Sequence, residues 1–281
     1  MLVTLAVAII IAGAALTAYI VPGLPDIDSL RDVQMQVPLH IYTSDASLIA
    51  EFGEKRRAPV AIADVPPLLV NAFVAAEDDR FFQHPGVDWQ GIVRAAVNLA
   101  ITGEKTQGGS TITMQVARNF FLTREKSYVR KLNEIFLALK IEQELSKEEI
   151  MELYLNKIYL GQRAYGIGAA AQVYYGAGVG ELDLAEMAMI AGLPKAPSTT
   201  NPISNVQRAL QRREYVLRRM LELGFIEDAD YQKASTSSST ASLHAADIDV
   251  EAPYVAEAVR KEIIDKHGEP AYEAGYRVFT T

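Results

Sequence analysis

The chain has 281 residues, 49% of them hydrophobic, so it is long enough to bury a core in one large domain or two small ones. Its 27 basic residues against 35 acidic residues argue against a general nucleic-acid-binding protein. The absence of cysteine excludes disulfides and cysteine-ligated zinc, and the four histidines lack the paired spacing of a histidine-built metal site.

An uncharged apolar segment begins the chain. Residues 2–21, LVTLAVAIIIAGAALTAYIV, are long enough to cross the hydrocarbon core of a membrane as a helix. A cleaved signal peptide is the alternative, but the segment is longer than the usual hydrophobic region of such a peptide and no basic region precedes it. The sequence therefore predicts a transmembrane anchor at residues 1–23.

Residues 24–65 predict a juxtamembrane connector followed by a small β-hairpin. Proline and glycine mark the connector. Residues 37–53 then alternate between apolar and polar side chains, as in two short strands that turn around Ser44 and Asp45.

A helix that begins at Pro66 and Pro67 is predicted to end in three acids, residues 77–79. Glu77 shares a stripe with apolar residues, where a carboxylate loses hydration, and acids at a helix C-terminus face the negative end of the macrodipole. One explanation is a solvated helix end with Arg80 as an ion partner. The other is that Glu77 is kept in apolar surroundings for its chemistry.

The segment at residues 106–121, TQGGSTITMQVARNFF, predicts a tight turn that leads into a second helix. Gly108 and Gly109 permit the turn, and Ser110 or Thr111 can cap the helix that follows. Free amides at a helix N-terminus favour an anion, although an ordinary helix cap is the alternative.

Cations follow this turn in the sequence. Arg118 lies in the second helix, and Arg130 and Lys131 stand before Glu134 in the segment RKLNE. An exposed helix face, in which Arg130 and Glu134 pair at i,i+4, is the alternative to an anion site.

The rest of the chain is predicted to be mainly α-helical up to Leu223, including one amphipathic run from Tyr128 to Leu160 that Gly161 can terminate. The basic amphipathic helix at residues 207–224 is assigned a structural role. Residues 226–281 are predicted to be a linker and the start of a following domain, with a helix at 251–268 and a strand that begins at the end of the chain.

Five segments, taken together and in order, resemble the peptidoglycan glycosyltransferase domain of class A penicillin-binding proteins and of monofunctional biosynthetic transglycosylases. They are EDDRFFQHPG (77–86), GGSTITMQ (108–115), RKLNE (130–134), LNKIYLG (155–161) and AEMAMIAGLPKAP (185–197). The resemblance implies a mainly α, lysozyme-like fold with a membrane-proximal jaw lobe, and a glycosyltransferase domain at residues 66–225. It places this domain on the periplasmic, outer face of the cytoplasmic (inner) membrane.

The resemblance also implies the reaction. Lipid II is polymerised into glycan strands with release of undecaprenyl pyrophosphate and inversion at the anomeric carbon. Glu77, with a pKa raised by its apolar neighbours, would be the general base, and Arg118, Arg130 and Lys131 would receive the pyrophosphate. Glu134 would be a second catalytic acid, which either orients the cations or holds a divalent metal such as Mg²⁺.

By the same resemblance, further residues contact the substrate: Asp78, Phe81, His84, Ser110, Thr111, Gln115 and Asn119. The expected partners are lipid II, the growing glycan chain, membrane lipid and regulators of cell-wall synthesis, with no nucleic acid. The amphipathic segment at 89–105 lies either in the membrane surface or in the core.

Two residues depart from the family pattern. Met114 stands where a glutamine is usual, and Arg118 stands where lysine is common, so we expect an altered substrate geometry with activity retained. No SxxK nucleophile occurs, so these residues should not bind penicillin. A lytic enzyme that cleaves glycan with Glu77 as a general acid, and a non-catalytic membrane scaffold that binds lipid II, remain as alternatives.

Overall fold

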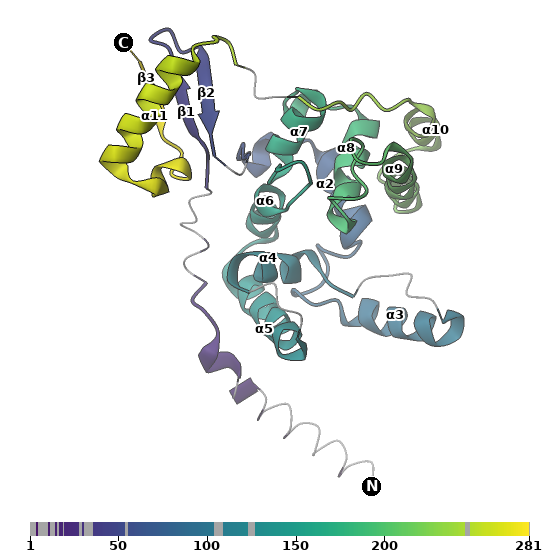
Figure 1. Cartoon of the computed structure of the whole chain (residues 1–281). Helices are drawn as coiled ribbons and strands as arrows, with labels where there is room; N and C mark the ends of the chain where they lie inside the picture. The colour runs from purple at the N-terminus through teal and green to yellow at the C-terminus, as the bar shows by residue number, and fades with distance from the viewer. Residues whose placement is uncertain are drawn as a thin grey trace. The chain divides into compact units, whose positions relative to one another are not determined.

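The computed structural model describes residues 4, 11, 15, 17, 18, 20–27, 30, 36–53, 56–103, 109–122, 127–244 and 248–280 (Figure 1). The chain forms two compact units. The first consists of Met1–Val33 and Arg80–Ile150, and the second consists of Gln34–Asp79 and Met151–Thr281. The prediction of a mainly α chain with a small β element is confirmed.

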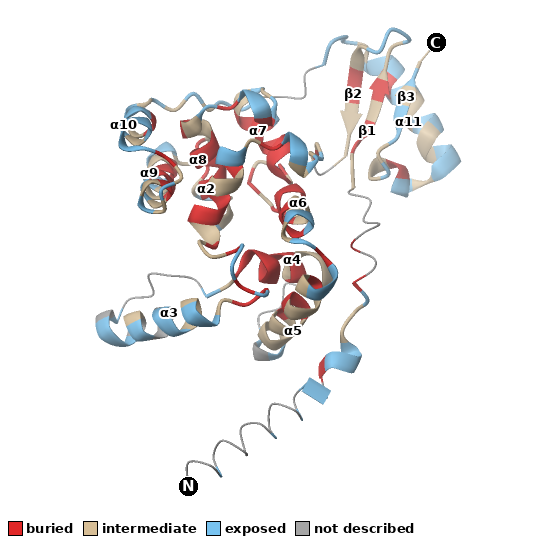
Figure 2. Ribbon diagram, turned by 180° about the vertical axis from the view of Figure 1, so that it is seen from behind, coloured by how far each residue is buried: buried red, intermediate tan, exposed pale blue. Residues whose placement is uncertain are grey.

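The first unit is helical. Its elements are a short 3-10 helix (Val21–Gly23), α3 (Trp89–Thr102), α4 (Ile112–Phe121), α5 (Tyr128–Glu144) and the beginning of α6 (Lys147–Lys157). Helix α4 packs against α5, where Met114 and Ala138 are buried together with Val87. Most of α4 is buried, whereas α3 is largely exposed (Figure 2).

The predicted continuous helix from Tyr128 to Leu160 is wrong, because the run is divided into α5 and α6. The side chain of Ser146 accepts a hydrogen bond from the Glu149 amide, and Glu149 accepts one from the Ser146 amide. This reciprocal cap starts a new helix and satisfies amides that a helix start leaves without intrahelical partners. The apolar periodicity continues across the break, so it did not reveal the boundary.

The second unit is also mainly helical. Its helical elements are 3-10 helix Ile62–Asp64, α2 (Pro67–Glu77), the rest of α6, α7 (Ile167–Tyr175), 3-10 helix Val179–Glu181, α8 (Leu184–Gly192), 3-10 helix Leu193–Lys195, α9 (Val206–Glu222), α10 (Asp228–Thr236), α11 (Pro253–His267) and 3-10 helix Glu269–Tyr272. Helices α2, α8 and α9 pack together. Phe73 of α2 is fully buried and lies edge-on to Tyr154 of α6, with ring centroids 5.9 Å apart.

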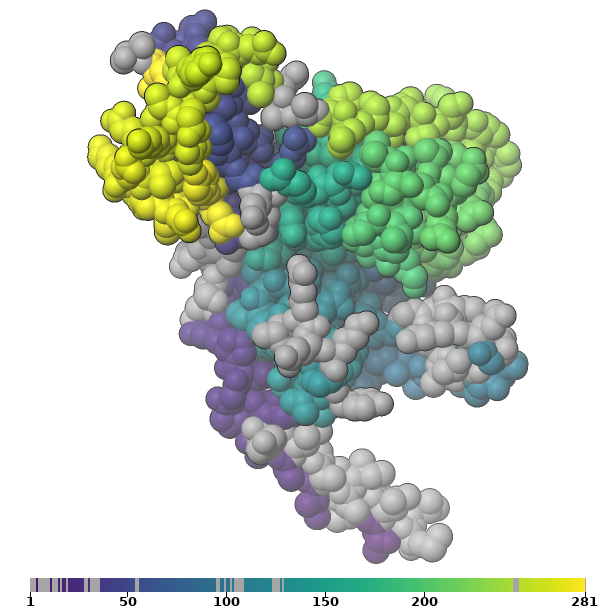
Figure 3. Space-filling view, viewed as in Figure 1, coloured from purple at the N-terminus to yellow at the C-terminus, as the bar shows by residue number. Residues whose placement is uncertain are grey.

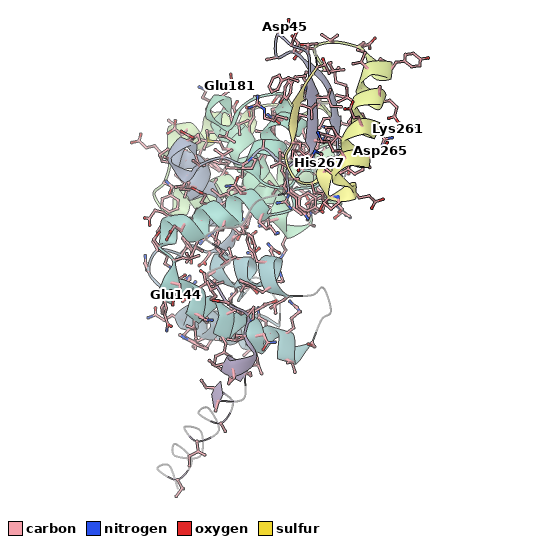
Figure 4. The ribbon with its side chains drawn as sticks, turned by 90° about the vertical axis from the view of Figure 1, so that its left-hand side faces the viewer. Asp45, Glu144, Glu181, Lys261, Asp265 and His267 are labelled. Carbon is pink, nitrogen blue, oxygen red and sulfur yellow. The ribbon has the colours of Figure 1, made fainter. Side chains whose placement is uncertain are left out.

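A three-stranded sheet completes this unit, in the order β2-β1-β3. Strands β1 (Leu39–Tyr42) and β2 (Leu48–Phe52) form the predicted antiparallel hairpin, and Asp45 lies in its turn (Figure 4). Strand β3 (Arg277–Phe279) confirms the strand expected near the end of the chain and pairs in parallel with β1. Helix α11 covers the sheet, so the yellow atoms of the C-terminal segment lie against the hairpin in Figure 3.

The predicted membrane anchor at residues 1–23 lies mostly outside the described residues. Among the residues that the structure describes, no helix combines the length and the apolar character needed to cross a bilayer. The anchor therefore stays a prediction.

Candidate active site

Glu77 is the last residue of α2, in the second unit. The helix places it there because Phe73 and Leu69, four and eight residues earlier, are buried on the same stripe. The predicted apolar stripe is thus confirmed. The Glu77 side chain is 15% exposed, and its Oε1 atom lies 3.6 Å from a terminal nitrogen of Arg212 on α9.

The two aspartates after Glu77 end the helix. Asp78 is buried and its amide donates to the carbonyl of Val74, so it closes the last turn of α2. Asp79 accepts a hydrogen bond of 2.8 Å from Arg219 of α9. Burial lowers the pKa of Arg219, but the hydrogen bond to Glu222 and the charge of Asp79 outweigh it and raise this pKa overall. Arg219 therefore stays charged beside the acids.

A cluster of two cations around one buried acid lies in the first unit. Arg130 and Lys131 both donate to the carboxylate of Glu134, Lys131 at 2.8 Å, and Glu134 is 1% exposed. Lys131 also donates to the hydroxyl of Ser110 at 2.8 Å. The structure thus brings together four of the predicted site residues, and their cluster carries a net positive charge.

Thr111 caps the helix beside this cluster, as predicted. Its hydroxyl accepts from the amide of Met114 and donates to the carbonyl of Gly86 at 2.5 Å. Gly86 has φ +89°, and a Cβ at this position would lie 2.7 Å from the Ala138 carbonyl oxygen. Only glycine suits this site. The hydrogen bond from Thr111 and the close approach to Ala138 hold the loop of the EDDRFFQHPG segment against the start of α4 and against α5.

Lys147 fastens the same loop from another side. Its ammonium donates at 2.7 Å to the carbonyl of His84 and to Glu142, and it lies 4.5 Å from the ring centroid of Phe81. Phe81 and His84 are both buried. The contacts of Lys147 hold the loop in place. The buried side chains of Phe81 and His84 pack beneath it.

Gln115, Arg118 and Asn119 follow Thr111 on α4. Gln115 is buried, and Arg118 and Asn119 are half-buried. Spacings of four and seven residues place Gln115 and Arg118 on one side of the helix with Thr111. Met114 is buried in the core with Val87, so its departure from the family pattern concerns core packing.

Glu134 does not suit a divalent metal. Its two oxygens already accept hydrogen bonds from Arg130 and Lys131. Within the described part of the chain, no group of three or more acidic or histidine side chains is arranged to hold a metal. A divalent metal prefers several oxygen ligands that do not already bind cations, so the surroundings of Glu134 do not fit one.

Glu77 and Asp78 lie in the second unit, and the cation cluster lies in the first. That they act on the same substrate stays a prediction. The basic helix, to which the sequence assigned a structural role, is α9, and its Arg212 and Arg219 contact the acids at the end of α2. Both arginines stand on one side of α9 with buried Val216. A charged residue on an apolar stripe, as at Glu77, was the sequence pattern that could have indicated these contacts.

The chain is similar to proteins of a known class. A family model described as Transglycosylase matches residues 45–221. The chain is 54% identical to Penicillin-binding protein 1A of Escherichia coli (strain K12) and 52% identical to that of Pseudomonas aeruginosa, each over 99% of its own length. It spans only 33% and 34% of these two relatives.

A solved structure is also similar. The crystal structure of Penicillin-Binding Protein 1A from Haemophilus influenzae superposes with a TM-score of 0.51 at 38% sequence identity. The similarity covers 88% of this chain and 27% of that chain.

Proposed function

Because the chain belongs to the transglycosylase family and carries a peptidoglycan glycosyltransferase domain, we propose that it polymerises lipid II into glycan strands. The observation that carries this proposal is the buried Glu134 that holds Arg130 and Lys131 beside the start of α4. Such a cluster suits an anionic leaving group, because fixed positive charge stabilises the negative charge that develops on it.

The proposed reaction uses one base and one anion site. Glu77 takes the proton of the acceptor sugar's 4-hydroxyl as its oxygen forms a bond to the anomeric carbon of the donor. The bond between that carbon and the pyrophosphate oxygen breaks, with inversion, and both electrons leave with undecaprenyl pyrophosphate. Lys131 and Arg130, with Ser110 and the capped start of α4, receive the pyrophosphate.

Arg118, Gln115 and Asn119 extend the proposed substrate surface along α4. Asp78, Phe81 and His84 would shape the part of that surface that the first motif contributes. We further propose a lysozyme-like domain at residues 66–225, on the outer face of the inner membrane. The anchor at 1–23 and the connector at 24–65 would hold it there, with residues 226–281 leading to a following domain. Regulators of cell-wall synthesis would be its protein partners.

Helix α3 supports the membrane-surface placement. Its exposed apolar residues recur every four positions, at Trp89, Val93, Val97 and Ile101, with exposures of 55, 62, 52 and 77%. A long exposed apolar stripe on an amphipathic helix is suited to the headgroup region of a bilayer. We therefore propose that α3 inserts into the membrane surface near the lipid tail of the substrate.

Trp89 is the only tryptophan, so its fluorescence reports on α3 alone. Adding phosphatidylglycerol and phosphatidylethanolamine vesicles is expected to shift the emission to shorter wavelength. A variant with Val93→Glu and Val97→Glu should lose this shift and keep its stability within about 0.5 kcal/mol, because both side chains are exposed. Val255→Glu on α11 is the matched control and should shift as the wild type does. An unchanged shift in the double variant would contradict the insertion.

The reaction is tested by incubating the chain with lipid II and, separately, with finished peptidoglycan. Polymer from lipid II and no fragments from peptidoglycan are expected. Fragments from peptidoglycan would favour the lytic enzyme, in which Glu77 acts as a general acid. Binding of lipid II without either product would favour the non-catalytic scaffold.

A further inference from the structure

Arg212 of α9 is held on three sides. Its Nε donates to the carbonyl of Gly192, the last residue of α8, at 3.3 Å. Its guanidinium carbon lies 4.3 Å from the ring centroid of Tyr215. The third side is the Oε1 atom of Glu77, 3.6 Å from a terminal nitrogen. Helices α2, α8 and α9, which carry these groups, pack together (Figure 1).

We propose that Arg212 is a positioning residue for the Glu77 carboxylate, and that Gly192 in the fifth motif is needed to admit the Arg212 side chain. This inference rests on the proposed function, in which Glu77 is the general base. It gives the basic helix α9 and the segment AEMAMIAGLPKAP a part in the reaction.

The distance between Arg212 and Glu77 suits this role. A contact of 3.6 Å is longer than a hydrogen bond, so Arg212 orients the carboxylate by the attraction of its charge. The carbonyl of Gly192 and the ring of Tyr215 fix the guanidinium, so its position does not depend on the ion pair alone.

The requirement for glycine at 192 is steric. Its φ of −76° and ψ of −21° are ordinary for any residue. A Cβ there would lie 2.9 Å from Cγ of Arg212, in the middle of the side chain. An alanine would therefore displace Arg212 from Glu77 while leaving the backbone of α8 unstrained.

Arg219, seven residues further along α9, makes a second contact with the end of α2. It holds Asp79 at 2.8 Å, so two arginines from one side of α9 contact two acids at the end of α2. Acids at a helix C-terminus are unfavourable next to the macrodipole, and neighbouring cations offset this cost. The α9 arginines thus explain how Glu77 and Asp79 are tolerated at this helix end.

The test measures lipid II polymerisation by the chain in detergent micelles, with kcat and KM determined separately. Arg212→Gln is expected to lower kcat by about 10- to 100-fold, because a small displacement of a catalytic group has effects of this size, and to leave KM within about twofold. Arg212→Lys should restore part of kcat. Gly192→Ala, which keeps the arginine, should lower kcat in the same way.

Arg218→Gln is the matched control, because Arg218 lies on the same helix but is 56% exposed. It should keep the wild-type kcat. The inference is overturned if Arg212→Gln or Gly192→Ala keeps the wild-type kcat, or if Arg212→Lys loses as much as Arg212→Gln. Glu77→Gln, measured in parallel, separates the two ideas. If it stays active, the proposed function fails. If it is inactive while Arg212→Gln is fully active, only the present inference fails.

Discussion

Replacing Glu77 by glutamine is expected to reduce lipid II polymerisation by about 10²- to 10⁴-fold, the range that a positioned general base contributes. Glutamine has nearly the same shape but cannot accept the proton of the acceptor hydroxyl. The fold should be retained, because Arg212 keeps its contacts with Gly192 and Tyr215. Losing a partly exposed ion pair costs about 0 to 1 kcal/mol, and removing an acid from a helix C-terminus offsets part of this.

The measurement is initial-rate polymerisation of labelled lipid II, accompanied by thermal unfolding followed by circular dichroism. Glu262→Gln on exposed α11 is a suitable control, since it makes the same change of charge away from the site. Wild-type turnover by Glu77→Gln would remove the general base from the mechanism. If the wild type itself formed no polymer, the non-catalytic scaffold would be favoured instead.

Parts of the site could be predicted because their signals are local. The stripe that ends at Glu77, the capping role of Thr111 and the i,i+4 spacing of Arg130 and Glu134 each depend on a few neighbouring residues. Arg130 and Glu134 do pair at i,i+4. However, Glu134 is buried and also binds Lys131, so the exposed helix face considered as the alternative is wrong. The local pattern of the sequence could not predict that Glu134 is buried.

Other features depend on partners that are distant in the sequence. Strand β3 pairs with β1 from the opposite end of the chain, and no local pattern specifies which strands meet. The contact of Arg212 with Glu77 likewise requires that α9 pack on α2. A basic amphipathic helix has the same sequence pattern whether its arginines face water or a carboxylate. The contact between Arg212 and Glu77 therefore becomes visible only when the packing of the helices is known.

Within the first unit, Glu134→Gln is expected to have the largest combined effect on stability and on polymerisation. Glu134 is 1% exposed and compensates two cations, so a neutral side chain leaves Arg130 and Lys131 repelling each other. Breaking a buried pair from one side costs several kcal/mol. Because Lys131 is 40% exposed, we expect a loss of about 2 to 4 kcal/mol in unfolding free energy. Polymerisation should fall by about 10²-fold or more, since the cations are no longer fixed.

A double variant, Glu134→Gln with Lys131→Gln, separates stability from catalysis. Removing Lys131 relieves the repulsion, so part of the lost unfolding free energy should return in denaturant titrations. It also removes the cation that contacts Ser110, so turnover should fall further. Opposite changes in the two measurements are expected only if the cluster acts on the substrate. If turnover recovered along with stability, Arg130, Lys131 and Glu134 would serve the fold alone, and the site for the departing pyrophosphate would have to lie elsewhere.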